Sequence, residues 1–507
     1  MYEKKTHDEL NSPEVYGRNY SAAVINLGCK VNRYEADSMR KLMADSGITL
    51  VEADDIADFY IVNTCSVTNI AERKSRQMLR RAKRRNPEAV VIAAGCYVNA
   101  AHDELLALDY VDAVIGNDRK AYIMDVLRSY MKKDCITDTL SNVTGHDSYD
   151  FGDVDDYNEA CDKLKTDMYV RIDRTEGYEE IGELSAAYLD HQRAYIKIQD
   201  GCNQFCSYCI IPYTRGRIRS RALENIIEEI TGLARSGVKE FVLTGIHISS
   251  YGKDFAGTSQ ELSECDKHVD LADLICAVSD IPEVERIRLG SLEPRIITGD
   301  FLERISKATK LCPHFHLSLQ SACNETLKRM NRKYTIEEYM KSCELLRHYY
   351  DRPAITTDVI VGFPGETEEE FNTTVNNLKR LGLYEIHVFK YSVRHGTIAE
   401  KMPDQVPDNI KNERSDILLE LTAGQKKNYE RSLAGLNDEV LVEEKAECIN
   451  NDIVKKAGDI TDINTIECND ESVDSGNKMF TGYTKRYVKV YVNSENDITG
   501  DIIPYIF

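Results

Sequence analysis

The chain contains 507 residues, and at roughly 150 residues per domain this length favours about three domains. Hydrophobic residues make up 42% of the chain, which is enough to bury ordinary cores and excludes a wholly disordered protein. Its 64 basic and 85 acidic residues give a net charge of −21, which argues against holding nucleic acid by overall positive charge. A nucleic-acid partner would need a local basic surface or a shape-reading pocket.

The sequence shows no membrane or secretion signal. No apolar stretch approaches the roughly 18 residues that span a bilayer, and residues 1–20 are charged and polar without a signal-peptide core. We therefore expect a cytoplasmic protein that does not bind a membrane. Because a reducing cytoplasm disfavours structural disulfides, the fifteen cysteines are candidates for binding metals or clusters.

Residues 21–135 form the first predicted domain, in which strands alternate with helices. This alternation is typical of an α/β fold with a parallel sheet that is covered on both faces. The predicted strands are 23–27, 59–63, 89–94 and 113–115, and the predicted helices are 32–46, a helix ending at 85, 100–108 and 122–131.

Residues 136–190 break this pattern, because Asp, Glu, Tyr and Gly crowd the segment, and we interpret it as an acidic linker with an insertion. The alternation resumes over residues 191–432. Six strand–helix units predict a partial (β/α)6 barrel rather than a complete eight-fold barrel. The predicted strands are 194–198, 240–243, 286–289, 314–319, 357–361 and 386–391.

The last segment, residues 436–507, changes to the alternation that is typical of strands. Its predicted strands are 439–442, 487–492 and 502–507, and they favour a small antiparallel β barrel. An acidic, Asn-rich insertion over residues 445–477 interrupts this segment.

Three cysteines, Cys202, Cys206 and Cys209, stand in the string DGCNQFCSYCIIPYTRGRIRSR, directly after the first predicted strand of the middle segment. Their C-x3-C-x2-C spacing lets three thiolates converge on one 4Fe-4S cluster and leaves one of its four irons open for a substrate or cofactor. A zinc site is the alternative, but zinc needs a fourth ligand and no histidine occupies a motif position.

Three further cysteines, Cys29, Cys65 and Cys96, each follow a predicted strand and precede a helix, in NLGCKVNRYEAD, VNTCSVTN and AAGCYVN. Because the carboxyl ends of parallel strands meet at one sheet edge, we expect these thiols to lie together there. The adjacent helix N-termini favour thiolates and the negative charge of a cluster. For any one of them the alternative is a small buried hydrophobic residue.

The C-x3-C-x2-C string resembles the signature of the radical S-adenosylmethionine superfamily. With the N-terminal cysteines and the C-terminal β segment, the whole pattern is similar to the methylthiotransferase family. Two short departures from the family pattern are Ala322-Cys323 and Val98-Asn99. The other similar strings are LTGIHISSYG (243–252), RLGSLEP (288–294), LQSACNETLKRMNRKYT (319–335), TDVIVGFPGETEEEF (357–371) and FKYSVRHGTIAEKM (389–402).

This resemblance implies two 4Fe-4S clusters, one ligated by each cysteine triplet, and S-adenosylmethionine as the further cofactor. It also implies an external one-electron donor of the flavodoxin or ferredoxin type, since no flavin motif is visible. Tyr208 would pack near the adenine of the cofactor, although a plain core aromatic would explain it as well. The residues expected to bind the cofactor are Tyr208, Gly245, Glu293, Gln320 and Gly362.

Within the family, GCKVNRYEAD resembles the subgroup that adds a methylthio group to C2 of N6-threonylcarbamoyladenosine at position 37 of tRNA. Members that act on isopentenyladenosine usually have a GCQMN-like string, and ribosomal-protein modifiers have a GCPKN-like string, so those substrates remain alternatives. An alternative of another class is a non-catalytic RNA-binding protein with structural zinc.

Three basic groups are candidates for binding tRNA. The tail string GYTKRYVKVYV (482–492) resembles the TRAM RNA-binding module and combines charge with stacking rings, although strand packing would explain it equally. The four arginines after the cysteine loop could hold phosphates or carboxylates. The residues concerned are Arg73, Lys74, Arg76, Arg80, Arg81, Lys83, Arg84 and Arg85 in one predicted helix, Arg215, Arg217, Arg219 and Arg221 after the loop, and Tyr483, Lys485, Arg486 and Tyr487 in the tail.

Overall fold

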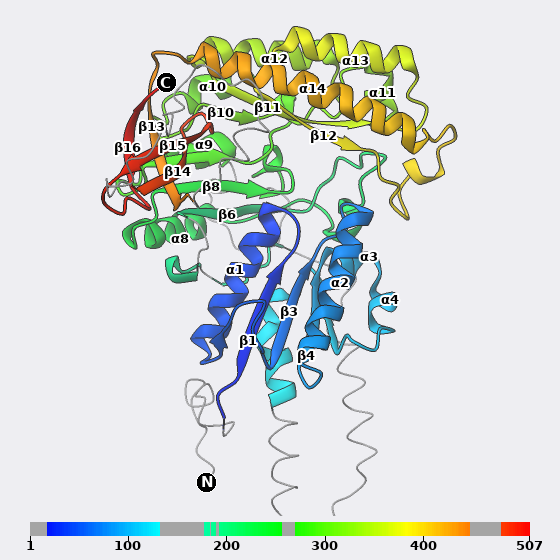
Figure 1. The fold of residues 1–507 in the computed structure, drawn as a ribbon, viewed down its shortest axis with the longest axis vertical. Helices are drawn as coiled ribbons and strands as arrows, with labels where there is room; N and C mark the ends of the chain where they lie inside the picture. Colours follow the sequence, from blue (N-terminus) through cyan, green and yellow to red (C-terminus); the bar gives the residue numbers. More distant parts are fainter. Residues whose placement is uncertain (1–17, 132–176, 183, 189–191, 256–268, 447–477) are drawn as a thin grey trace, which may run out of the picture.

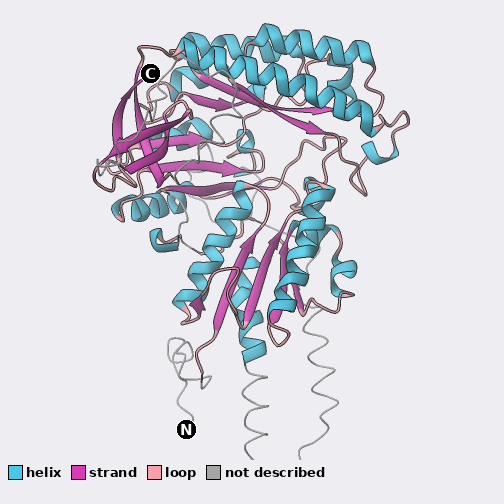
Figure 2. Cartoon of the chain, in the orientation of Figure 1, coloured by secondary structure: helices cyan, strands magenta, loops and turns pink. Residues whose placement is uncertain are grey.

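The computed structural model describes residues 18–131, 177–182, 184–188, 192–255, 269–446 and 478–507. Figure 1 shows an N-terminal α/β unit below a larger α/β unit, with a small sheet at one side of the larger unit. Figure 2 shows that helices flank the strands of both α/β units. None of the helices in the described ranges is long and apolar enough to cross a membrane.

The N-terminal unit contains a parallel sheet with the strand order β2-β1-β3-β4-β5, as predicted. Phe59 packs into one core cluster and Tyr60 into another, so the central strand is buried on both faces and reads as a continuous apolar run. The predicted helix 100–108 is two short helices with a break at Ala101. The elements are β1 (Ser21–Asn26), α1 (Lys30–Asp45), β2 (Thr49–Leu50), β3 (Phe59–Thr64), α2 (Asn69–Arg85), β4 (Val90–Gly95), α3 (Cys96–Ala100), α4 (His102–Leu106), β5 (Ala113–Ile115) and η2 (Lys120–Tyr122).

The larger unit is the predicted partial barrel of six parallel strands, in the order β6-β8-β9-β10-β11-β12, with the short β7 antiparallel beside β6. Isolated bridges from Ile287 to Leu311 and from Leu292 to Leu317 join its two sheets. The strands are β6 (Arg193–Asp200), β7 (Arg219–Ser220), β8 (Glu240–Gly245), β9 (Arg286–Leu289), β10 (His314–His316), β11 (Ala354–Val361) and β12 (Glu385–Lys390).

Helices cover the outer face of this barrel. Alternate strand residues such as Ile287 and Val359 belong to one core cluster with helix residues such as Leu346, so their neighbours in the strands point to the inner face. The helices are α7 (Ile211–Thr214), α8 (Leu223–Arg235), η5 (Ile248–Ser250), α9 (Leu271–Ser279), η8 (Pro294–Ile296), α10 (Gly299–Ile305), α11 (Asn324–Arg329), α12 (Ile336–Tyr349), α13 (Glu368–Leu381), η9 (Ala399–Lys401) and α14 (Asp408–Ser432).

The C-terminal strands form an antiparallel sheet in the order β15-β14-β13-β16. The string at 482–492 forms a hairpin, because Tyr487 adopts a φ of 64° and Thr484 N donates to Val488 O at 3.0 Å. The predicted strand 487–492 is its second arm. The strands are β13 (Asn437–Lys445), β14 (Lys478–Thr484), β15 (Lys489–Ser494) and β16 (Ile502–Ile506).

Part of the predicted acidic linker packs between the two α/β units, around η4 (Ala186–Tyr188). Ile181 joins a core cluster of the N-terminal unit and Leu184 joins that of the barrel. The described linker residues therefore form a packed contact between the two units and do not act only as a spacer. The rest of the predicted linker, and the insertion at 447–477, lie outside the described residues.

Candidate functional site

The cysteine loop follows β6 at the carboxyl end of the barrel, where its backbone folds back on itself. Gly201 has a φ of +68°, and a Cβ there would lie 1.7 Å from the Arg217 carbonyl oxygen, so only glycine fits. Cys202 N donates to Gly216 O at 3.0 Å, and Asn331 Nδ2 donates to Phe205 O at 2.8 Å. These contacts hold the loop at the end of the strand.

The three thiols of this loop interact with one another. Burial, together with the neighbouring Cys206, raises the pKa of Cys202 to about 11 and that of Cys209 to about 12. Arg332 Nη1 donates to Cys206 Sγ at 3.2 Å. A guanidinium in this position stabilises negative charge on the sulfur atoms.

The N-terminal thiols meet at the carboxyl edge of the first sheet, as predicted. Cys29 caps α1, Cys65 directly follows β3, and Cys96 directly follows β4. A Cβ on Gly28, whose φ is +116°, would lie 3.1 Å from Cys65 Sγ, so glycine lets the first loop approach the second. Burial, together with the neighbouring Cys96 and Cys29, raises the pKa of Cys65 to about 12.

Arg215, from the segment after the barrel cysteines, links the barrel to the N-terminal triplet. Its side chain is fully buried, and its Nε donates to Cys96 Sγ at 3.2 Å. Its Nη1 donates to Glu35 Oε1 at 2.8 Å and to Asp200 Oδ2 at 3.0 Å. A residue of the barrel loop thus contacts a thiol of the N-terminal unit.

Two buried lysines complete this network. Lys197 Nζ lies 2.9 Å from Glu35 Oε1 and 2.7 Å from Asp200 Oδ2, and Lys120 contacts the other oxygen of Glu35. Burial alone would raise the pKa of Glu35, but Arg215, Lys120 and Lys197 hold it well below its usual value. The three cations outnumber the two carboxylates, so the network favours an anionic group at the adjacent thiols.

The spacing of the thiols fits a cluster better than a single zinc ion. Among the described residues, only the group His316, Asp358 and His387 brings three metal-ligating atoms within 4.8 Å of one another. A tetrahedral zinc with Zn–S bonds of about 2.3 Å would hold its sulfur atoms about 3.8 Å apart. Neither triplet is that compact, whereas a cubane with four irons at its corners accepts a wider set of thiolates.

The predicted cofactor residues lie at the carboxyl ends of successive barrel strands. Gly245 ends β8, Glu293 follows β9, Gln320 follows the β10 segment, and Gly362 follows β11. Tyr208 lies in the cysteine loop. The structure therefore brings all five to the end of the barrel that carries the cysteine loop.

Two of these residues also have conformational roles. Gly362 has a φ of +70°, and a Cβ there would lie 2.3 Å from Cγ of Lys411 in α14. Tyr208 packs edge-on against Phe363, with ring centroids 6.3 Å apart. Their cofactor contacts remain predictions.

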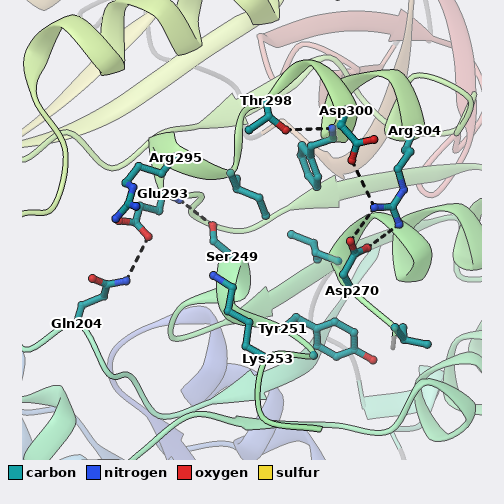
Figure 3. A pocket seen from close by; sticks show the side chains of 15 residues that line it. Gln204, Ser249, Tyr251, Lys253, Asp270, Glu293, Arg295, Thr298, Asp300 and Arg304 are labelled. Atoms are coloured by element: carbon teal, nitrogen blue, oxygen red, sulfur yellow. Dashed lines mark hydrogen bonds and ion pairs between the residues drawn. The ribbon is translucent and has the colours of Figure 1, made fainter. Parts of the chain in front are cut away.

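A cavity of about 640 Å³ adjoins this end of the barrel (Figure 3). Gln204 of the cysteine loop donates to Glu293 Oε2 at 3.2 Å at one side, and Arg304 pairs with Asp270 at 2.7 Å at the other. The lining includes none of the six ligand cysteines. Only the Gln204–Glu293 side therefore adjoins the predicted cofactor site.

Sequence reasoning missed His247 and the two arginines that contact thiols. His247 Nε2 lies 3.2 Å from Glu293 Oε2. Burial would raise the pKa of Glu293, but the hydrogen bond from His247 and its charge hold it below the usual value. His247 and Arg332 lie inside strings that resemble the family, and this resemblance could have pointed to them. Arg215 was named in the sequence only as one of four arginines after the cysteine loop, without its contact to a thiol.

The basic helix α2 has a paired part and a free part. Arg81 and Arg85 each lie 2.8 Å from Asp54, and Lys83 lies 2.9 Å from Asp112. Arg76 contacts Tyr97 and Glu104. Four exposed cations of α2 have no side-chain partner in the described part of the chain, and they are Arg73, Lys74, Arg80 and Arg84.

The other two basic groups serve mainly as internal contacts. Arg219 and Arg221, like Arg215, are buried and pair with carboxylates, whereas Arg217 is exposed over the ring of Phe205. These four arginines were predicted to bind either phosphates or carboxylates. The structure shows that three of them bind carboxylates of the chain.

The tail residues face the barrel instead of solvent. Tyr487 stacks on His314 with centroids 4.9 Å apart, and its hydroxyl accepts from Arg193 at 3.0 Å. Arg486 pairs with Asp438 at 2.9 Å. The structure therefore shows Tyr487 and Arg486 packed inside the protein, which was the alternative to RNA binding.

Comparisons with known proteins place these features in context. The Radical SAM superfamily matches residues 196–378, and a family described as Uncharacterized protein family UPF0004 matches residues 21–116. The threonylcarbamoyladenosine tRNA methylthiotransferase MtaB of Bacillus subtilis is 35% identical over 485 residues, which covers 95% of this chain and 92% of the relative.

A tRNA-2-methylthio-N(6)-dimethylallyladenosine synthase of Acetivibrio thermocellus is 34% identical over 424 residues, which covers 82% of this chain and 79% of that protein. The overall sequence identity is therefore nearly the same for the relative that is named for threonylcarbamoyladenosine and for the one that is named for dimethylallyladenosine. Among solved structures, the radical S-adenosylmethionine methyltransferase TsrM of Kitasatospora setae shares 14% identity at a TM-score of 0.48, covering 74% of this chain and 75% of that one.

Proposed function

Because the chain belongs to the radical S-adenosylmethionine tRNA methylthiotransferase family, we propose that it adds a methylthio group to C2 of N6-threonylcarbamoyladenosine at position 37 of tRNA. The relatives that carry this substrate in their names include the MtaB proteins of Bacillus subtilis and Aquifex aeolicus, at 35% and 36% identity. The string that begins at Cys29 supports the same subgroup.

The observation that carries this proposal is the presence of two thiol triplets, with Arg215 of the barrel bound to Cys96 and Glu35 of the N-terminal unit. Cys202, Cys206 and Cys209 would hold the cluster that binds S-adenosylmethionine, and the N-terminal triplet would hold the second cluster. When bound, the first cluster supplies the electron that cleaves S-adenosylmethionine, and the second supplies sulfur. Each triplet lies at the carboxyl ends of strands of a parallel sheet, which supports this proposal.

The residues of the chain have supporting tasks in this reaction. Arg215 and Arg332 hold negative charge at one sulfur of each triplet. The Glu293, His247 and Gln204 group lies where the polar end of the cofactor would bind. The buried ionic network fixes the N-terminal unit against the barrel, so that the distance between the two centres is set by packing.

The partners follow from this activity. The substrate is tRNA, and the free cations of α2, Arg73, Lys74, Arg80 and Arg84, offer a surface for its phosphates. The reaction needs an external one-electron donor of the flavodoxin or ferredoxin type, and such a reaction would take place in the cytoplasm. We also propose that the three domains span residues 21–135, 191–432 and 436–507.

The test is reconstitution with iron and sulfide, followed by reaction with S-adenosylmethionine, a reductant and tRNA. We expect about eight irons per chain and mass-spectrometric detection of 2-methylthio-N6-threonylcarbamoyladenosine. A parallel reaction uses tRNA that carries N6-isopentenyladenosine. Product from the second tRNA alone would replace the proposed substrate, and zinc without iron would remove the enzyme assignment.

A further inference from the structure

Three side chains from neighbouring strands form a polar group on the inner face of the barrel. His316 of β10 lies with its Nε2 3.3 Å from Asp358 Oδ2 of β11, and its Nδ1 lies 3.0 Å from Thr356 Oγ1. His387 of β12 stacks on His316 with ring centroids 5.8 Å apart. Three neighbouring strands thus present titratable side chains to one place.

This group is not part of the packed core. The alternate residues Phe315, Val359 and Ile386 point outward and belong to the apolar cluster under the helices. His316 and Asp358 keep partial solvent contact, and His387 is exposed. A polar group that is open to solvent on the inner face of a barrel is suited to bind a ligand.

Lys30 adds a cation beside this group. It is the first residue of α1 and directly follows Cys29. Helix α1 packs against β6 and β8 of the barrel. The charges of Arg193, Arg288, Glu240 and Asp358, all on barrel strands, act on Lys30, and Lys30 in turn acts on His314 of β10. Lys30 is exposed and its side chain has no hydrogen bond or ion pair within the described ranges. The ammonium is therefore available to a ligand.

We propose that Lys30, His316, Asp358 and His387 form the subsite that receives the threonylcarbamoyl group of the substrate nucleoside. This rests on the proposed function. Lys30 binds the carboxylate of the threonyl part, and the His316–Asp358 pair binds its hydroxyl group. These contacts make the subsite selective for an N6 substituent that carries a carboxylate.

The position of Lys30 beside a ligand of the sulfur-supplying cluster agrees with the chemistry of adenine. C2, which receives the sulfur, and N6, which carries the substituent, lie on the same edge of the base, separated by N1 and C6. A group that holds the N6 substituent must therefore lie near the N-terminal cluster. Lys30 is adjacent to Cys29 and faces β11, so it satisfies this requirement.

Two other ligands fit this place less well. A dimethylallyl substituent is apolar, and it would leave Lys30 without a partner, which costs free energy. The same three strand residues could ligate a metal ion, but Lys30 lies beside them and Arg193 and Arg288 lie beside Lys30. These cations disfavour a divalent metal.

The test compares binding of two tRNAs that differ only in the threonylcarbamoyl group at position 37. We expect the reconstituted enzyme to bind the modified tRNA more tightly than the unmodified one, and Lys30→Gln to reduce this preference by about tenfold to a hundredfold, the usual loss for a charge-assisted hydrogen bond. Lys30→Arg should keep most of the preference. Lys41→Gln, in the same helix and paired with Asp45, is the matched control.

Since Lys30 adjoins a cluster ligand, Asp358→Asn and His387→Phe give a second measurement on strands that carry no ligand. We expect both to reduce the same preference, and iron content and circular dichroism show whether the fold is kept. Full preference in all of these variants, together with modification of threonylcarbamoyladenosine by the wild type, would overturn the subsite and leave the proposed function intact.

Two further outcomes are distinct from this one. Modification of isopentenyladenosine tRNA alone would overturn the proposed function as well as the subsite. One equivalent of a metal other than iron in the wild type, lost in His387→Phe, would overturn the subsite in favour of a metal site.

Discussion

The two cysteine triplets bring three thiols together by different means. Cys202, Cys206 and Cys209 belong to one loop, which a left-handed glycine and backbone hydrogen bonds fold at the end of β6. The N-terminal thiols come from the ends of three separate strand segments and meet only because the sheet is parallel. The first site thus depends on the conformation of one loop, and the second depends on how three strands are arranged in a sheet.

This difference extends to the surroundings of the thiols. The loop triplet receives Arg332 from the segment after α11, inside its own barrel. The assembled triplet receives Arg215 from another unit, through a buried network that includes Glu35 and Asp200. The assembled site therefore depends on the junction between the units, and the loop site does not.

The largest expected effect separates the two triplets directly. Cys206→Ala removes one ligand of the barrel cluster, so formation of 5′-deoxyadenosine should fall to background and iron should fall to about half of about eight per chain. The N-terminal cluster should remain visible by its absorption. Wild-type cleavage of S-adenosylmethionine in this variant would contradict the assignment of the loop.

The reciprocal change tests the assembled site. Cys65→Ala should stop formation of the methylthio product and remove about four irons, while 5′-deoxyadenosine is still formed. The nucleosides are measured by mass spectrometry. Normal amounts of methylthiolated tRNA would show that Cys65 is a structural residue.

The third change tests the dependence on the junction. Arg215→Met removes a buried cation from Glu35 and Asp200, so the free energy of unfolding should fall by about 3–5 kcal/mol. Arg332→Met is the matched change at the loop site, where the loss should be about 1–3 kcal/mol. Urea denaturation followed by circular dichroism measures both. Equal losses would remove the distinction between the two sites.

A carboxyl group at the same junction should give a pH dependence. Burial raises the pKa of Glu179 to about 7, while the hydrogen bond from Ala121 N and the charges of Lys197 and Lys120 oppose this shift. Glu179 Oε2 is buried and has no hydrogen-bond partner among the described residues. Glu179 is therefore expected to be protonated in the folded protein under mildly acidic conditions.

Because the folded pKa of Glu179 lies above its ordinary value of 4.5, its stabilising contribution is complete below pH 4.5 and is lost as the pH rises through about 7. Between about pH 5 and about pH 8 the loss should be about 2–3 kcal/mol. Glu179→Gln should remove this part of the pH dependence in urea denaturation. An unchanged pH dependence would show that Glu179 is ionised in the folded protein.

The smallest effect concerns the outer surface of the assembled site. Replacing Arg73, Lys74, Arg80 and Arg84 with Gln should reduce the salt dependence of tRNA binding by about one unit per phosphate contact. Arg81 and Arg85, which pair with Asp54, are the control pair. An unchanged salt dependence in the four-fold variant would exclude α2 from the tRNA site.

The sequence predicted that each set of three thiols would come together, for reasons that the structure makes clear. The loop triplet was readable because its ligands lie within one string, and the assembled triplet was readable because strand ends of a parallel sheet share an edge. The contacts of Arg215 with Cys96 and Glu35 were not readable, since they depend on how two units pack. For the same reason the sequence left open whether Tyr487 and Arg486 bind RNA or pack inside the protein.

The C-terminal sheet closes the amino end of the barrel. Arg286 and Arg288 of β9 donate to backbone carbonyls of Tyr483, Glu439, Lys485 and Thr484. Truncation at residue 436 would leave these guanidinium groups facing water beside the apolar strands. The sheet is therefore an integral part of the barrel and not an independent domain. In the proposed reaction, nucleoside and cofactor would therefore reach the inner face from the opposite end or through the open side of the partial barrel.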